Sequence, residues 1–177
     1  MTIQNRKRRS KKIPKEKQNS NTRGSAGQYY VAGELSRRGL VAVITQGNTL
    51  FTDILCSNLQ ANRFLHIQVK TFSPEKGTCT LGEKAENPIG ENFFWVLAGI
   101  PTPRSQLPFE YFIIPSMELA AQVKKSHQLW LATPGKGGVP HKQTTMRNIF
   151  TNRKLNTGWD IQVYKNRWDL IEDRLKP

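Results

Sequence analysis

The sequence is poor in apolar residues and cysteine, and it has no long hydrophobic run. Apolar residues make up 37% of the 177 residues, and the deficit is concentrated at the front of the chain. No stretch approaches the ~20 apolar residues that a membrane span needs, and no apolar run follows the basic start as in a signal peptide. The two cysteines, Cys56 and Cys79, have no metal-ligand spacing and form no disulfide framework. We therefore expect a soluble protein in a reducing cytoplasm, without a membrane partner.

Acidic residues are also scarce, and the imbalance is greatest in residues 1–23. The chain has 27 Lys and Arg against 13 Asp and Glu, for a net charge of +14. Residues 1–23 hold nine of the positive charges and only Glu16 as a negative one. This segment has no aromatic residue, so it cannot bury enough surface to order itself. We expect a disordered basic tail over residues 1–23 and one folded domain over residues 24–177.

A tail of this kind indicates a nucleic-acid partner. Lysine and arginine bind phosphate backbones with an affinity that falls as salt rises. An anionic membrane fits less well, because Ile3 and Ile13 are the only sizeable apolar groups and form no amphipathic anchor. The expected location is the nucleoid, although a nuclear-import signal would have the same composition. The tail residues predicted to contact nucleic acid are Arg6, Lys7, Arg8, Arg9, Lys11 and Lys12.

Hydrophobic periodicity predicts an α/β domain from residue 25 onward. Ser25 and Gln28 form a potential capping box for a helix that ends near Gly39, with Val31 and Leu35 on one apolar stripe. Strand patterns follow, and a helix is expected from Ser116 to about Leu131. Residues 73–92 and 133–157 resemble loops, and an amphipathic piece over 159–170 closes the domain. The predicted strands are Val41–Thr45, Phe51–Cys56, Phe64–Thr71, Phe93–Ile100 and Tyr111–Ile114.

This order of elements predicts a mixed central β-sheet flanked by helices. The run over 93–100 is apolar at nearly every position, as in a strand covered on both faces.

One carboxylate stands out in the second strand pattern. Asp53 interrupts an otherwise apolar run, where a charge is costly unless it is paired or bound to a cation. Gln68 and Lys70 lie two residues apart and so project from one face of the third strand. If these strands pair as a hairpin, the three side chains meet at one end of the sheet. Glu34, at the border of the helix stripe, could reach the same cluster. A buried Asp53–Lys70 ion pair without catalytic function is the alternative interpretation.

The ordered set of Glu34, Asp53 and Gln68-Val69-Lys70 resembles the PD-(D/E)XK nuclease superfamily. The likeness covers residues 24–71, and the following strands and helix continue in the order that fold expects. Within the superfamily, the Q-x-K form is similar to the small intron-encoded homing endonucleases, and the helix glutamate is similar to that of Holliday-junction resolvases. The resemblance implies a restriction-endonuclease-like core of α-β-β-β-α-β order.

The resemblance also implies a function and a set of roles. Asp53, Glu34, Gln68 and the Val69 carbonyl would hold Mg²⁺ or Mn²⁺, and Lys70 would position the attacking water. The expected activity is hydrolysis of phosphodiester bonds in DNA, with RNA as another potential partner. Two departures occur: Thr52 stands where the family has proline, and Gln68 replaces an acidic residue. A neutral amide oxygen weakens metal binding, so a DNA- or RNA-binding module without turnover, or a subunit of a larger complex, is the rival interpretation.

A second basic region lies over residues 136–154. Cationic side chains alternate there with glycine, threonine and asparagine, which is typical of a solvated loop or of an arm that orders on DNA. Lys136, Lys142 and Arg147 are the residues of this region predicted to contact nucleic acid. Cutting both strands of a duplex would need two active sites, so the proposed activity also favours a homo-oligomer.

Overall fold

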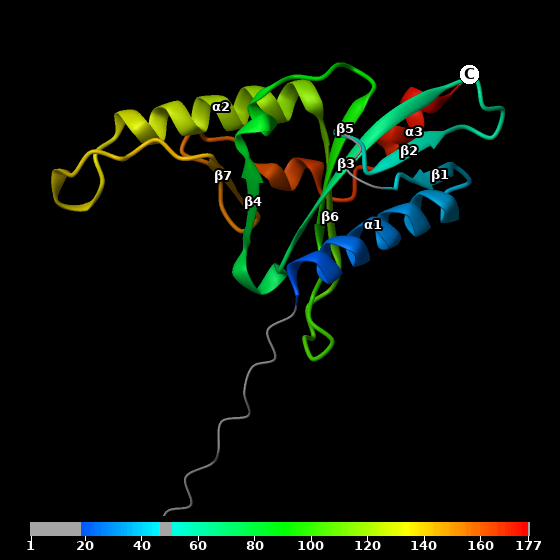
Figure 1. Cartoon of the computed structure of the whole chain (residues 1–177), viewed down its shortest axis with the longest axis horizontal. Coiled ribbons are helices and arrows are strands. Elements are labelled where there is room, and N and C mark those ends of the chain that lie inside the picture. Colours follow the sequence, from blue (N-terminus) through cyan, green and yellow to red (C-terminus); the bar gives the residue numbers. More distant parts are fainter. Residues whose placement is uncertain (1–18, 47–50, 177) are drawn as a thin grey trace, which may run out of the picture.

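A five-stranded mixed sheet forms the centre of the fold, with the strand order β1-β2-β3-β5-β6. The computed structural model describes residues 19–46 and 51–176 (Figure 1). All neighbouring strands are antiparallel except β3 and β5, which run parallel. The strands are β1 (Val41–Ile44), β2 (Ile54–Ser57), β3 (Phe64–Phe72), β5 (Phe93–Gly99) and β6 (Glu110–Pro115). This confirms the predicted mixed sheet.

The parallel pair β3–β5 requires a crossover, and this crossover contains a strand that the sequence did not reveal. It runs through the 3-10 turn η1 (Pro74–Lys76), β4 (Thr78–Gly82) and the 3-10 turn η2 (Glu83–Glu86). β4 pairs antiparallel with β7 (Met146–Phe150) as a separate two-stranded sheet. Segments 73–92 and 133–157 were therefore wrongly predicted as loops throughout. The predicted α-β-β-β-α-β order has an α-helix between its third and fourth strands. In this chain β4 and η2 occupy that position instead.

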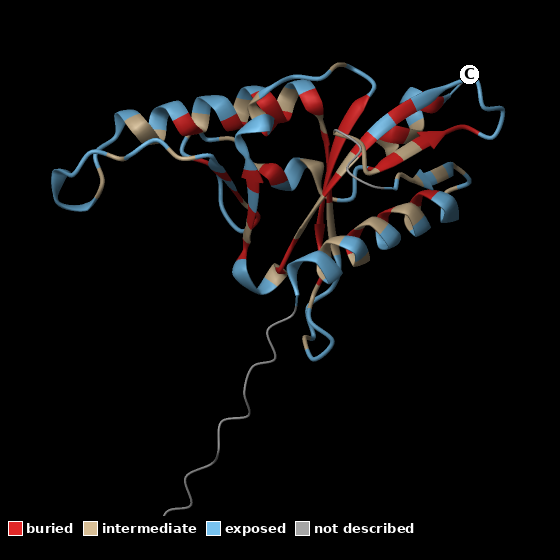
Figure 2. Cartoon of the chain, in the orientation of Figure 1, coloured by how far each residue is buried: buried red, intermediate tan, exposed pale blue. Residues whose placement is uncertain are grey.

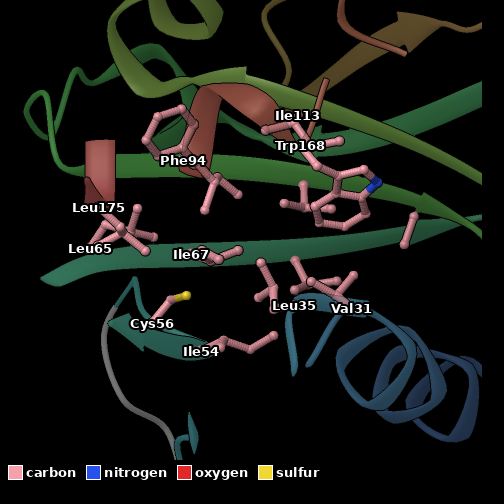
Figure 3. Close-up of a cluster of buried hydrophobic side chains, with 14 of the residues drawn as sticks. Val31, Leu35, Ile54, Cys56, Leu65, Ile67, Phe94, Ile113, Trp168 and Leu175 are labelled. Carbon is pink, nitrogen blue, oxygen red and sulfur yellow. The ribbon is translucent and has the colours of Figure 1, made fainter. Parts of the chain in front are cut away.

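Helices and the small sheet cover the two faces of the central sheet. On one face α1 (Ser20–Arg37) and α3 (Asp169–Leu175) pack on side chains that include Ile67 and Phe94 (Figure 3). On the other face α2 (Ser116–Ala132), the β4–β7 pair and η4 (Ile161–Tyr164) pack on Trp95 and Leu97. Every residue of β5 is buried, as Figure 2 shows for the middle of the sheet. This confirms the expectation of a strand covered on both sides.

The helix ends differ from the sequence prediction by a few residues. α1 begins at Ser20, where the side chain of Asn19 caps the Asn21 amide; residues 20–23 thus belong to the folded domain. The rest of the predicted tail, up to residue 18, lies outside the described residues. α2 begins at Ser116, as expected, but its buried hydroxyl accepts from the Ile89 amide and does not cap the helix. In the part of the chain described, no helix has the length and apolar character needed to cross a membrane.

Candidate active site

Asp53 lies immediately before β2, where the chain enters the sheet. Phe51 adopts a left-handed backbone conformation (φ 66°), and the main chain turns there into the strand. The Asp53 amide donates to the Ile67 carbonyl of β3 at 2.9 Å, and its carbonyl accepts from the Thr45 amide at 3.0 Å. The backbone of Asp53 is therefore held between β3 and the residue that follows β1, just before the start of β2.

Three donors converge on the Asp53 carboxylate. One oxygen, Oδ2, accepts from the Val69 amide at 2.7 Å and from the side-chain amide of Gln68. The other, Oδ1, accepts from Nε2 of Gln28 on α1 at 3.0 Å. The carboxylate thus joins β2, β3 and α1 at one point.

Gln28 reaches Asp53 because α1 approaches β3 very closely. The adjacent Gly27 is buried, and a Cβ atom at that position would collide with Cγ2 of Thr71 and contact Cγ1 of Val69 at 3.6 Å. Only glycine permits this approach. Gly27 therefore sets the distance between the helix and the strand that carries the candidate site.

Burial and local charge act in opposite directions on Asp53. Desolvation of the carboxylate raises its pKa above the ordinary value of 3.8, and this effect is the largest. The Val69 amide, the positive charge of Lys70 and the Gln28 amide each lower the pKa and offset part of the rise. Asp53 is thus a desolvated carboxylate stabilised by hydrogen-bond donors. Such perturbed carboxylates are more common in functional sites than on the rest of a protein surface.

Lys70 and Gln68 project from the same face of β3, as their spacing predicted. Both are half-buried, and Lys70 acts electrostatically on Asp53 and on the buried thiol of Cys79. His66 lies on this face too, and its Nδ1 is 3.1 Å from the Thr52 hydroxyl. The Thr52–His66 pair therefore lies beside the Asp53–Gln68 pair, each joining β3 to the segment just before β2.

The Val69 carbonyl faces the same edge of β3 as Asp53. Within a strand, the N–H and C=O of one residue point to the same side. The Ile67 carbonyl and the Val69 amide both contact Asp53, so the Val69 carbonyl points past the start of β2. This edge carries one carboxylate, two side-chain amides, a backbone carbonyl and a lysine.

The structure does not bring Glu34 into this cluster. Both oxygens of its carboxylate accept hydrogen bonds from arginines: Arg37 at 2.8 Å on each oxygen and Arg38 at 2.8 Å on one. The Arg37 hydrogen bond holds the pKa of Glu34 below its usual value. Arg38 extends the network to Glu172 of α3 at 2.8 Å. Glu34 therefore ties α1 to α3, and the expected contribution of α1 to the site comes from Gln28.

The sequence analysis assigned Gln28 to a capping box with Ser25. That assignment is wrong, because α1 begins at Ser20, eight residues before Gln28. A usable signal was present nonetheless. Gln28, Val31 and Leu35 are spaced i, i+3, i+7, so the glutamine continues the buried apolar stripe of α1. A polar residue on such a stripe needs a buried partner, and Asp53 is that partner.

The donor set fits a magnesium or manganese ion, although with little negative charge. Among residues 19–46 and 51–176, no three His, Cys, Asp or Glu side chains gather as a potential metal site. The available ligands are a carboxylate and the amide or carbonyl oxygens of Gln28, Gln68 and Val69. All are hard oxygen donors of the kind that Mg²⁺ prefers. Because Asp53 is the only anion among these four ligands and Lys70 is adjacent, such an ion would bind weakly.

The basic residues predicted to contact nucleic acid have different environments. Lys136 and Lys142 are exposed. The Arg147 side chain is buried, pairs with Glu86 and donates to the Thr144 and Met146 carbonyls. Arg147 therefore stabilises the β4–β7 unit and is not available to a phosphate backbone. The six predicted tail contacts between Arg6 and Lys12 lie outside the described residues.

Two solved structures are similar to this chain, and one of them has a TM-score above 0.5. A bacterial homing endonuclease superposes with a TM-score of 0.52 at 12% identity, over 88% of this chain and 93% of that one. The chain shares the fold of this homing endonuclease. Hjc, a Holliday junction resolvase from the archaeal hyperthermophile Archaeoglobus fulgidus, gives a TM-score of 0.41 at 17% identity, over 73% of this chain and 84% of that one. No protein-family model and no curated protein sequence matches the chain.

This fold accounts for the position of the cluster. In this chain the fold places the start of β2 beside the middle of β3 and packs α1 against both. Side chains that are 25 and 15 residues apart in sequence from Asp53 are thereby brought to the same carboxylate. The fold does not by itself establish activity, which depends on the chemistry of these side chains.

Proposed function

We propose that this protein is a divalent-metal-dependent endonuclease that hydrolyses phosphodiester bonds in DNA. The observation that carries the proposal is the Asp53 carboxylate, desolvated just before the start of β2 and held by Gln28, Gln68 and the Val69 amide, with Lys70 beside it. Phosphodiester hydrolysis needs positive charge near the phosphate and a positioned water molecule. The cluster offers groups suited to both tasks.

The residues divide the work as follows. Asp53, Gln68, Gln28 and the Val69 carbonyl would hold Mg²⁺ or Mn²⁺, with each glutamine turning its amide oxygen inward. The ion would supply positive charge that polarises the phosphodiester and the attacking water. Lys70 would orient that water and neutralise the negative charge that develops on the phosphate oxygens. The rigid strand β3 keeps Lys70 and Gln68 in fixed relation to Asp53.

A second candidate function is supported by the low charge of the cluster. Asp53 and Lys70 cancel, and Gln28 and Gln68 are neutral, so little attracts a divalent cation. In this second case the chain binds DNA or RNA without cutting it, alone or within a larger complex. The net charge of +14 favours nucleic-acid binding in both cases, so it does not distinguish the two functions.

A cleavage assay separates the two candidates. Purified full-length protein is incubated with supercoiled plasmid and with a branched DNA junction, in Mg²⁺, Mn²⁺ or EDTA. We expect nicked or linear products with either metal, none with EDTA and none from Asp53→Asn. Asp173→Asn, which changes an exposed carboxylate on α3, is the matched control and should cleave as the wild type does.

Variants of β3 test the individual roles. We expect Lys70→Met to lower turnover while leaving DNA affinity nearly unchanged, because it removes one charge among 27. Gln68→Leu should abolish cleavage since no oxygen remains, and Gln68→Glu should retain it with tighter Mg²⁺ binding. An inert wild type that binds DNA as tightly as all three variants would establish the non-catalytic function instead.

A further inference from the structure

A groove of about 510 Å³ lies between α2 and β7, apart from the Asp53 cluster. Its walls come from three segments: one face of α2, the strand β7 and the turn that follows β7. The side chains that matter for its chemistry are His127, Trp130, Asn148, Phe150, Arg153 and Asn156. A volume of this size lies within the range of pockets that bind small organic ligands, ~300–1,000 Å³.

The groove is formed by a segment without acidic residues. Between Leu119 and Trp159 the sequence has seven Lys and Arg and no Asp or Glu, and every groove residue lies within these bounds. Arg147 is neutralised by Glu86, but Arg153 is exposed and has no carboxylate partner among the described residues. The electrostatic field of this segment thus favours an anionic ligand.

The groove also offers planar surfaces. The Arg153 guanidinium lies over the Phe150 ring, with Cζ 3.9 Å from the ring centroid. The Trp130 ring stacks on His141 at a centroid distance of 4.1 Å and an interplanar angle of 12°. These contacts hold both platforms in place before any ligand arrives. Unpaired bases stack on aromatic rings and on arginine planes.

Amide groups between the platforms supply hydrogen-bonding capacity. Oδ1 of Asn148 accepts from the Thr80 hydroxyl at 2.8 Å, which orients the side chain on the exposed face of β7. Asn156 is oriented by Ser126, whose hydroxyl donates to its Oδ1 at 2.7 Å. The edges of a nucleobase are recognised by groups of this type.

We propose that this groove binds an unpaired nucleotide of a nucleic-acid strand, with its base against the Arg153–Phe150 platform. An intact duplex fits less well, because its bases are stacked inside the helix and its backbone needs cations and no aromatic walls. The proposal rests on the proposed function only in taking nucleic acid as the ligand. It needs no cleavage, so an inert Asp53 cluster would leave it standing.

Binding of short oligomers to the full-length protein in EDTA tests the proposal without turnover. The probes are a labelled eight-nucleotide thymidine oligomer, its uridine counterpart, an abasic oligomer of the same length and a blunt duplex, each followed by fluorescence anisotropy. Arg153→Lys keeps the positive charge and removes the planar guanidinium group that stacks on Phe150. We expect it to weaken binding of the thymidine oligomer about 5–20-fold and of the duplex less than about 2-fold, since only the unpaired base loses a stacking surface.

Two further variants complete the test. Trp130→Ala should reproduce the loss on the oligomers with bases and not on the abasic one, after thermal unfolding has verified that the variant folds. Lys125→Met removes an exposed charge of α2 that does not line the groove, and should weaken the binding of all four probes alike.

Equal losses with DNA and RNA oligomers support recognition of the shared base and phosphate chemistry. Wild-type affinity of Arg153→Lys for the single strands, or equal losses on duplex and abasic probes, would overturn the proposal.

Discussion

Gln28 of α1 donates a 3.0 Å hydrogen bond to Oδ1 of Asp53, although the two residues are 25 positions apart and lie on different elements. This contact makes the helix part of the candidate site. It also occupies the position at which a second carboxylate would create a strong cation site. The replacement of one amide by an acid is therefore the most informative change in the cluster.

We expect Gln28→Glu to make the thermal stability of the protein more dependent on a divalent metal ion. Two adjacent carboxylates repel each other in the absence of a cation, so the melting temperature should fall in EDTA. With Mg²⁺ it should recover and exceed the metal-induced rise of the wild type, because a ligand that binds only the folded state stabilises by RT ln(1 + [L]/Kd). The measurement is thermal unfolding across a Mg²⁺ titration, with Gln28→Leu as the control that adds no charge. A variant with the same Mg²⁺ response as the wild type would exclude a cation site at this edge.

Gly27→Ala should push α1 away from β3. The added methyl group collides with Cγ2 of Thr71, and overpacking of a buried contact costs about 1–3 kcal/mol. Gly33→Ala in the same helix is the matched control, because nothing lies within 4 Å of a Cβ there; it should stabilise by roughly 0.5–1 kcal/mol. Denaturant unfolding gives both values. Thr71→Ser removes the colliding methyl and should restore most of the lost stability, and no rescue would mean that the cost arises elsewhere.

The titration of Asp53 should depart from that of an exposed carboxyl. Desolvation raises its pKa above 3.8, and Lys70 opposes the rise, so Lys70→Met should raise it further. Since the folded state holds this proton more tightly than the unfolded chain, ionised Asp53 destabilises the fold at neutral pH. That cost disappears as pH falls from the raised pKa to below 3.8. Carbon-13 NMR of the carboxyl group measures the pKa directly; a value at or below 3.8 in the wild type contradicts the prediction.

Removal of residues 1–18 should weaken DNA binding and reduce its salt dependence. The segment carries eight Lys and Arg and only Glu16 as an acid, and each phosphate contact contributes about 0.9 to the slope of log affinity against log salt. The melting temperature should not change, because α1 begins at Ser20. Affinity for a duplex is measured at several salt concentrations for both proteins. An unchanged slope would show that the tail makes no phosphate contacts.

The sequence by itself determined which side chains of β3 share a face, and which strand would be buried on both sides. These features depend on local sequence: alternation brings Gln68 and Lys70 to one face, and an unbroken apolar run of strand length is typical of a strand covered on both faces. The isolated Asp53 was recognisable for a similar reason, because a carboxylate in an apolar run needs a partner wherever the fold places it.

Only the tertiary structure decided which partners Asp53 has and how the second half of the chain folds. Glu34 and Gln28 are both polar residues of one helix, and the choice between them depends on how far α1 slides along β3, which Gly27 and Thr71 settle through a steric contact. Likewise β4 and β7 are short and lie more than sixty residues apart, and each becomes a strand only by pairing with the other. Long-range pairing and helix docking depend on contacts that no local window of sequence contains.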